Sequence, residues 1–242
     1  MAHGHPDWGE SGIISTVFRV ADWGEIAARL GSVVTYHRGG NVVSIDDFNS
    51  GCVPGDLTTT GVGSQANLST RYYRSAPYSV LLYGGPAAGR SAQWNKSVNY
   101  LTPGKHGIEI HYRYALPQPL LYLYYTILDG SQQHGFGIRI NFQTGVVSYI
   151  DSLGAWTTLT TVGALVLSVF VFHAIKLIVD TESDSYVRLL VDQVAYDMLG
   201  LTITPLVMAG NQSIAVAVNS SSIGAGATTT HLDDVIITQN EV

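Results

Sequence analysis

The run 109–114, Glu-Ile-His-Tyr-Arg-Tyr, contains residue types that an acid–base enzyme uses. A polysaccharide lyase requires a histidine, a tyrosine and an arginine that converge on one sugar, and a retaining glycosidase requires two carboxylates about 5 Å apart. Alternation along a strand, however, would separate His111 and Arg113 from Tyr112 and Tyr114. Glu109 has no second carboxylate two or four residues away, and the chain contains no Gly-x-Ser-x-Gly elbow or phosphate-binding loop. The sequence therefore predicts that the protein is not an enzyme.

Two tryptophans are candidates for binding a glycan. Sugar sites stack a ring on an exposed aromatic side chain and hydrogen-bond to neutral or acidic groups. Trp94 stands between Gln93 and Asn95, and Trp156 follows Asp151 in an expected hairpin. Because aromatic side chains are also the ordinary filling of a β core, the sequence leaves both interpretations open for Trp94 and Trp156.

The elements that must position these residues are β-strands. The clearest pattern is 172–198, where an alternating run, a polar turn at 181–185 and a second run at 186–191 predict an antiparallel meander. Further strands are expected at 78–83, 108–116, 120–128, 136–142, 146–150, 213–218 and 235–238. Turns about every 8–12 residues are typical of a sandwich or a barrel. The sequence therefore predicts an all-β fold.

Residues 1–45 differ from the rest of the chain and are expected to form an N-terminal arm. Asp22, with Glu25 three residues later, predicts the start of a short helix that ends at Gly31, and a hairpin should follow it. Such an arm is too small to hold a core of its own. It either packs against residues 46–242 or embraces a neighbouring subunit.

The second arrangement predicts a homo-oligomer. Trp8, Phe18 and Trp23 are apolar anchors of the kind that concentrate binding energy at an interface.

The order of several segments resembles a known fold. These are an opening Asp46-Asp47-Phe48, the runs 75–82 and 107–110, the central 172–180 and a closing 233–237. Together they are similar to the concanavalin A-like, laminin-G-type jelly rolls of lectins, glycan-binding modules and virion proteins. The resemblance implies an antiparallel jelly-roll β-sandwich over residues 46–242. The arm is reminiscent of uncharacterised phage or prophage structural proteins.

The resemblance also implies a candidate calcium site. In such jelly rolls the first and last strands lie together, and a structural Ca²⁺ often sits there on carboxylate and carbonyl oxygens. Asp47 and Asp233 are the side chains expected to hold it, and no other cofactor is expected. The alternative is that these aspartates cap the strand ends and face water.

Composition restricts the partners. Charged residues make up only 12% of the chain and the net charge is −6, which argues against nucleic acid and anionic membranes. The longest apolar run, 162–172, is well short of the ~20 residues of a membrane-spanning helix and is expected to be a buried strand. Cys52 is the single cysteine, so no disulfide is expected. No secretion signal is recognised at the N-terminus, and the expected location is a virion or the cytoplasm.

These observations lead to two readings of function. The leading one is a structural protein of an assembly, as a capsid, decoration or tail component of a virion. The alternative is a carbohydrate-binding, lectin-like module.

Overall fold

The structure is a computed structural model, and it describes residues 40–52, 56–75, 77–99, 102–115, 120–162, 171–192, 194–224 and 226–241. The helix expected near residue 22, most of the expected hairpin, and Trp8, Phe18 and Trp23 lie outside these residues. Most of the apolar run 162–172 lies outside them as well. Among the described residues, no helix is both long and apolar enough to cross a membrane.

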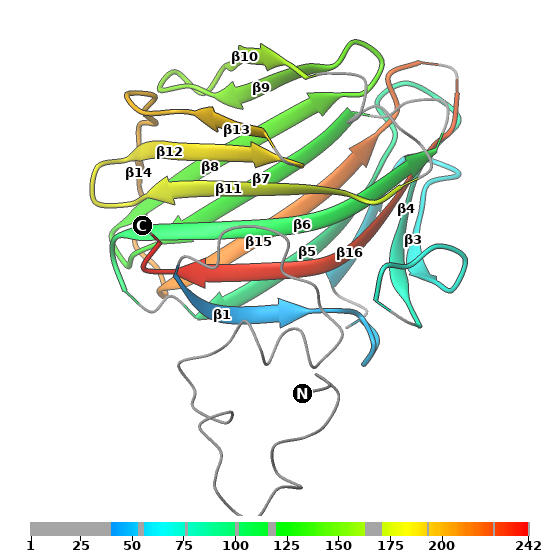
Figure 1. Ribbon diagram of the computed structural model, residues 1–242, viewed down its shortest axis with the longest axis horizontal. Coiled ribbons are helices and arrows are strands. Elements are labelled where there is room, and N and C mark those ends of the chain that lie inside the picture. Colours follow the sequence, from blue (N-terminus) through cyan, green and yellow to red (C-terminus); the bar gives the residue numbers. More distant parts are fainter. Residues whose placement is uncertain are drawn as a thin grey trace, which may run out of the picture.

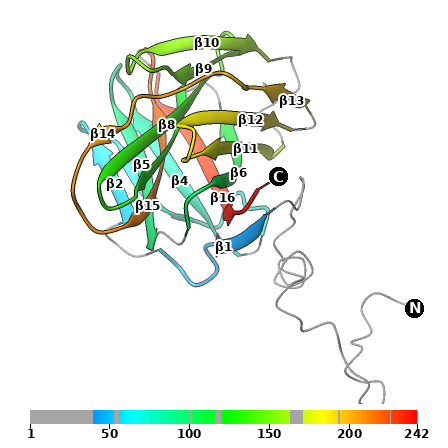
Figure 2. The ribbon, with the colours of Figure 1, turned by 90° about the vertical axis from the view of Figure 1, so that its left-hand side faces the viewer.

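The described residues form two antiparallel sheets packed face to face (Figures 1 and 2). Sheet A has the order β13-β12-β11-β6-β16-β4-β3, and β1 also pairs with β16. Sheet B has the order β10-β9-β8-β7-β15-β5-β2, and β14 also pairs with β8. The predicted all-β jelly-roll sandwich is therefore confirmed. The strand bounds in sheet A are β1 Asn41–Asp46, β3 Gln65–Ser69, β4 Ser79–Gly85, β6 Lys105–Ala115, β11 His173–Asp180, β12 Ser185–Val191, β13 Val194–Asp197 and β16 Thr228–Gln239. Those in sheet B are β2 Leu57–Thr60, β5 Ser91–Asn99, β7 Leu120–Leu128, β8 Gln132–Asn141, β9 Val146–Ile150, β10 Trp156–Thr161, β14 Leu206–Val207 and β15 Ser213–Ser221.

The first and last described strands lie together in sheet A, as the resemblance implied. β1 pairs antiparallel with β16, with Ile45 opposite Ile236 and Asp46 opposite Val235, and Figure 1 shows these two strands side by side. Residues 42–45 were expected in the hairpin of the arm. They lie in β1, so sheet A includes residues from Asn41 onward.

The predicted meander is β11-β12-β13, in which each strand pairs with the next. It runs from β13 at one edge of sheet A to β11, which pairs with the central strand β6. Tyr186 of β12 ties this side of sheet A to sheet B. Its hydroxyl donates to the carbonyl oxygen of Ile150 at 2.9 Å and accepts from the backbone N–H of Gly137 at 3.0 Å.

Alternation decides which side chains enter the core between the sheets. In β7, Leu121, Leu123, Tyr125 and Ile127 are buried in the core, and the residues between them are partly exposed. In β6, Tyr112 and Tyr114 are in the core, whereas Glu109 and His111 lie on the opposite face. The expected separation of His111 from the two tyrosines is therefore confirmed.

Candidate functional site

The outer face of sheet B carries a row of polar and aromatic side chains. Because Leu121, Leu123 and Tyr125 point into the core, Tyr122 and Tyr124 between them point outward. The register then aligns outward residues of neighbouring strands. Tyr122 of β7 lies opposite Asn219 of β15 and Arg139 of β8. Asn219 in turn lies opposite Gln93 of β5. The amides of Gln93 and Asn219, the phenol of Tyr122 and the guanidinium of Arg139 therefore lie in one row across four strands.

Three aromatic rings form the centre of this face. The rings of Tyr122 and Tyr124 are parallel, with an interplanar angle of 1° and centroids 5.9 Å apart. Trp156 of β10 meets them edge to face, at 5.6 Å from Tyr122 and 6.0 Å from Tyr124. The guanidinium carbon of Arg139 lies 5.0 Å from the centroid of the Trp156 ring. We call Tyr122, Tyr124, Trp156 and Arg139 the aromatic cluster.

Trp156 reaches the two tyrosines because the strand beneath it has no side chain at that point. Gly137 of β8 lies opposite Tyr124, and its outward position is filled by Ile150 and Trp156. A β-carbon at residue 137 would stand 2.5 Å from Cδ1 of Ile150 and 3.2 Å from Cη2 of Trp156. The glycine therefore holds open the space that the indole ring occupies.

A chain of hydrogen bonds fixes the amides beside the aromatic cluster. Asn219 Nδ2 donates to Gln93 Oε1 at 3.2 Å, and Gln93 Nε2 donates to Asn95 Oδ1 at 2.5 Å. Asn95 Nδ2 donates to Thr58 Oγ1 and to the carbonyl oxygen of Asp56, both at 3.3 Å. Each amide keeps further donor or acceptor capacity, so the row can bind a neutral polyhydroxylated ligand.

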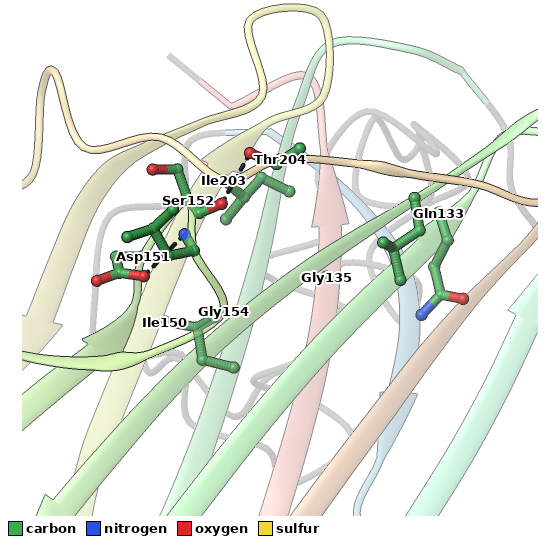
Figure 3. A pocket seen from close by; sticks show the side chains of 10 residues that line it. Gln133, Gly135, Ile150, Asp151, Ser152, Gly154, Ile203 and Thr204 are labelled. Atoms are coloured by element: carbon green, nitrogen blue, oxygen red, sulfur yellow. Dashed lines mark hydrogen bonds between the residues drawn. The ribbon is translucent and has the colours of Figure 1, made fainter.

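A cavity of about 410 Å³, drawn in Figure 3, has Ile150 in its lining, the residue that also touches Gly137 beneath the aromatic cluster. It lies where β9 ends and β14 begins to pair with β8, and Gln133 and Gly135 form its floor. The turn 151–154 and the segment 203–206 form its walls, and Thr204 Oγ1 donates to the carbonyl oxygen of Ser152 at 2.8 Å. Ile150, which touches Gly137, also lines the cavity. Ile150 therefore lies between the cavity and the aromatic cluster.

Tyr124 and Asp151 have shifted pKa values, which bear on the charge of the aromatic cluster and the cavity. Burial, with a smaller effect of Tyr122, raises the pKa of Tyr124, so that its hydroxyl stays neutral. Hydrogen bonds from the Thr157 hydroxyl and the Ala155 backbone N–H lower the pKa of Asp151, so that its carboxylate stays charged. The face thus offers neutral hydroxyl and amide groups, one cation at Arg139 and one anion at Asp151.

The two tryptophans that were candidates for glycan binding lie in different environments. Trp94 is fully buried in the core, where it meets Phe48 edge to face at 5.6 Å. The prediction that Trp94 binds a glycan was therefore wrong, because alternation in β5 turns its ring inward while Gln93 and Asn95 point outward. Trp156 does lie on the outer face of sheet B. Sequence reasoning did not select Tyr122, Tyr124, Arg139 or Asn219, although the alternation of β7 already separated Tyr122 and Tyr124 from Tyr125.

The two aspartates named for calcium are occupied by other groups. Asp47 accepts from the backbone N–H of Asn49 at 3.1 Å and from its side-chain amide at 2.8 Å. Asp233 accepts from the backbone N–H groups of Arg74, Ser75 and Asp234 at 2.6, 3.0 and 2.9 Å. These donors take lone pairs that a cation would need. Within the described ranges, no group of three or more His, Cys, Asp or Glu side chains is placed to hold a metal ion.

Comparisons with known proteins establish the fold. No family model and no curated protein sequence matches the chain. Among solved structures, a carbohydrate esterase from Shiga toxin-encoding bacteriophage phi24B superposes with a TM-score of 0.55 and 14% identity, covering 82% of this chain and 98% of that one. Lectin I-B4 from Griffonia simplicifolia superposes with a TM-score of 0.50 and 11% identity, covering 81% and 98%. The chain thus has the concanavalin A-like jelly-roll fold.

A further similarity corrects the expectation that the chain is not an enzyme. An endo-β-1,4-glucuronan lyase from the fungus Trichoderma reesei superposes with a TM-score of 0.51 and 11% identity, covering 82% of this chain and 95% of that one. The esterase and the lyase have the same fold as this chain. The missing carboxylate pair and serine elbow therefore do not exclude catalysis, because one fold can carry several chemistries.

Proposed function

We propose that the protein binds a glycan on the outer face of sheet B. The observation that carries the proposal is the aromatic cluster, in which parallel tyrosines and an edge-on tryptophan stand beside a row of amides. Sugar rings have apolar faces that stack on aromatic side chains, and hydroxyl groups at their edges that hydrogen-bond to amides. Tyr122, Tyr124 and Trp156 supply the first kind of contact, and Gln93 and Asn219 supply the second.

The cavity extends this surface and suits an oligosaccharide rather than a single sugar. The Gln133 amide and the Asp151 carboxylate offer polar contacts, and Ile150, Leu153 and Leu206 offer apolar ones. Leu153 and Leu206 are strongly exposed at its rim. A chain of sugars that crosses the aromatic cluster would continue into this cavity.

Solved structures with this fold support the proposal, since their titles name a lectin, a carbohydrate esterase and a glucuronan lyase. They support glycan recognition better than the virion role that was the leading interpretation of the sequence. A virion location and a homo-oligomer stay predictions, because their candidate residues Trp8, Phe18 and Trp23 lie outside the described residues.

Glycan-array screening followed by calorimetry with the best ligand tests the proposal. Trp156→Ala and Tyr122→Ala should each weaken binding by about tenfold, which corresponds to about 1.4 kcal/mol for a lost ring contact. Tyr73→Ala is the matched control, because Tyr73 is an exposed aromatic residue that follows β3 of sheet A. Equal affinity in all three variants would refute the proposed site.

The same glycans also serve as substrates in an activity assay. New unsaturated ends would reveal elimination, released acetate would reveal an esterase, and new reducing ends would reveal hydrolysis. Loss of any such activity in Trp156→Ala, with unchanged activity in Tyr73→Ala, would assign the reaction to the aromatic cluster.

A further inference from the structure

A second cavity, of about 300 Å³, lies on the outer face of sheet A, on the opposite side of the sandwich from the aromatic cluster. It is formed by β3, β4 and β16, which are neighbours in the sheet, and by the residues that follow β3. Its polar lining consists of Gln65, Ser69, Arg71, Tyr83, Thr229 and His231. Leu81 provides an apolar patch among them. We call this space the sheet A pocket.

Two arginines converge on one ring beside the sheet A pocket. The guanidinium carbon of Arg113 lies 3.6 Å from the centroid of the Tyr72 ring, and that of Arg71 lies 5.1 Å from it. The ring of His231 meets Tyr72 edge to face at 5.1 Å, and β16 places His231 directly opposite Arg113 of β6. Arg71, which lines the cavity, and Arg113, the cross-strand neighbour of the lining residue His231, therefore both contact the Tyr72 ring.

Within the described parts of the chain, no carboxylate neutralises these two arginines. Arg74, the third arginine of the region, is ion-paired with Asp234 at 3.3 Å. Neither Arg71 nor Arg113 has such a pair, and the buried Nη1 of Arg113 has no hydrogen-bond partner there. Burial, followed by the positive charges of Arg113 and Arg71, lowers the pKa of His231 to about 4. A buried donor without a partner is costly, so a ligand anion that reaches Nη1 of Arg113 beside His231 would remove that cost.

The remaining lining groups are neutral and can bind hydroxyl groups. The side chains of Gln65, Tyr83 and Thr229 make no hydrogen bond to another described residue and face the cavity. They offer an amide and two hydroxyl groups, each of which can donate and accept. A ligand that matches both sets of groups carries a carboxylate next to several hydroxyls.

We propose that the sheet A pocket binds a sugar acid, with its carboxylate on Arg113 and Arg71 and its hydroxyls on Gln65, Tyr83 and Thr229. Guanidinium and carboxylate groups form short, charge-assisted hydrogen bonds, and the planar shape of both groups favours paired contacts. This site is separate from the glycan-binding face, because it lies on the other sheet and shares no residue with it.

Calorimetry of the full chain at pH 7 and low ionic strength tests the proposal, with sodium D-glucuronate as the probe. We expect glucuronate to bind with a dissociation constant of about 1 mM, and D-glucose and sodium acetate to bind about tenfold more weakly. Arg113→Gln and Arg71→Gln should each weaken glucuronate binding by about tenfold. Because Arg71 is exposed, we expect Arg71→Gln to leave the fold intact. This variant therefore tests the proposal even if Arg113→Gln lowers the melting temperature.

Two controls separate this site from other effects. Arg188→Gln removes the same charge from the outer face of sheet A, on β12, and should leave glucuronate binding unchanged. Trp156→Ala should also leave it unchanged, so failure of the proposed glycan-binding face would not be mistaken for failure of this pocket. Glucuronate binding that is absent at roughly 10 mM, equal in Arg71→Gln and the unaltered protein, or matched by acetate would overturn the proposal.

Discussion

Trp156 lies over Gly137, with Cη2 of the indole 3.2 Å from the position that a β-carbon at residue 137 would occupy. This contact joins β10 to β8 on the outer face of sheet B, two strands that β9 separates. It also explains how the indole comes within 6.0 Å of Tyr124, since Tyr124 is directly opposite Gly137 in the ladder. The aromatic cluster therefore depends on one residue that has no side chain.

Gly137→Ala should weaken glycan binding severalfold with only a moderate loss of stability. The added carbon would stand 2.5 Å from Cδ1 of Ile150, so Ile150 must rotate and the indole must shift. Overpacking of this kind typically costs about 1–3 kcal/mol, and alanine's better fit in a strand offsets part of it. Urea unfolding and calorimetry measure the two effects. Gly135→Ala is the control for the stability measurement, because a β-carbon there meets no atom within 4 Å.

Gly135→Leu tests whether the cavity of Figure 3 belongs to the glycan site. Gly135 forms part of its floor, and the space above it is open, so a leucine side chain would enter the cavity without displacing the core. We expect the melting temperature to stay the same or rise, since leucine suits a strand better than glycine does. Binding of a longer oligosaccharide should fall, whereas binding of a disaccharide on the aromatic cluster should persist. Equal loss for both ligands would contradict this division.

Local signals in the sequence predicted much of the fold and little of the site. β7 and β9 have the bounds that alternation and flanking turns predicted, 120–128 and 146–150. β5 was missed because its outward residues are neutral amides and serines and one alternate inward position is Lys96. Assigning Trp94 to the core required knowledge of which face of β5 is covered. That depends on pairing with β15, more than 110 residues later.

Contacts between residues that are distant in sequence were not predicted, because they too depend on strand pairing. The buried Lys176 forms an ion pair with Glu241 at 2.7 Å, and no local pattern links residues that far apart. The aromatic cluster likewise draws on β7, β8 and β10, and only the register of sheet B brings its residues together. Composition and the alternation of apolar residues can therefore identify single candidates such as Trp156. They do not identify the residues from other strands that complete a site around it.

His134 should contribute measurably to the docking of the two sheets. Its Nδ1 lies 2.6 Å from Oδ1 of Asp184 in the β11–β12 turn of sheet A, and its Nε2 lies 3.4 Å from Oδ2 of Asp129 in the β7–β8 turn of sheet B. His134→Gln should lower the free energy of unfolding by about 1–2 kcal/mol, towards the low end because both carboxylates are partly exposed.

A double-mutant cycle isolates the His134–Asp184 contact. Asp184 has a φ of 51°, and Asp184→Asn keeps a residue type that tolerates this backbone conformation while removing the charge. We expect a coupling energy above about 0.5 kcal/mol from urea unfolding of the two single variants and the double variant. Additive effects would show that the sheets dock without help from this pair.

Asp233 should make stability fall as the pH rises. Burial and then the neighbouring charge of Asp234 raise the pKa of Asp233 from 3.8 to about 7, despite three backbone N–H donors. The folded protein therefore holds a proton that the unfolded chain releases near pH 4. Since the folded state binds more protons in this interval, the contribution of Asp233 is fully present below about pH 4 and is lost by about pH 7.

Asp234→Asn separates this effect from the opposite effect of histidines. His231, whose pKa burial lowers to about 4, loses its contribution to stability as the pH falls from 6.5 towards 4. It partly cancels the effect of Asp233 in the unaltered protein. Removing the Asp234 charge should lower the pKa of Asp233, so the variant should lose less stability than the unaltered protein between pH 4 and pH 7. Urea unfolding at four or five pH values measures both slopes. Parallel slopes would mean that Asp234 does not set the ionisation of Asp233.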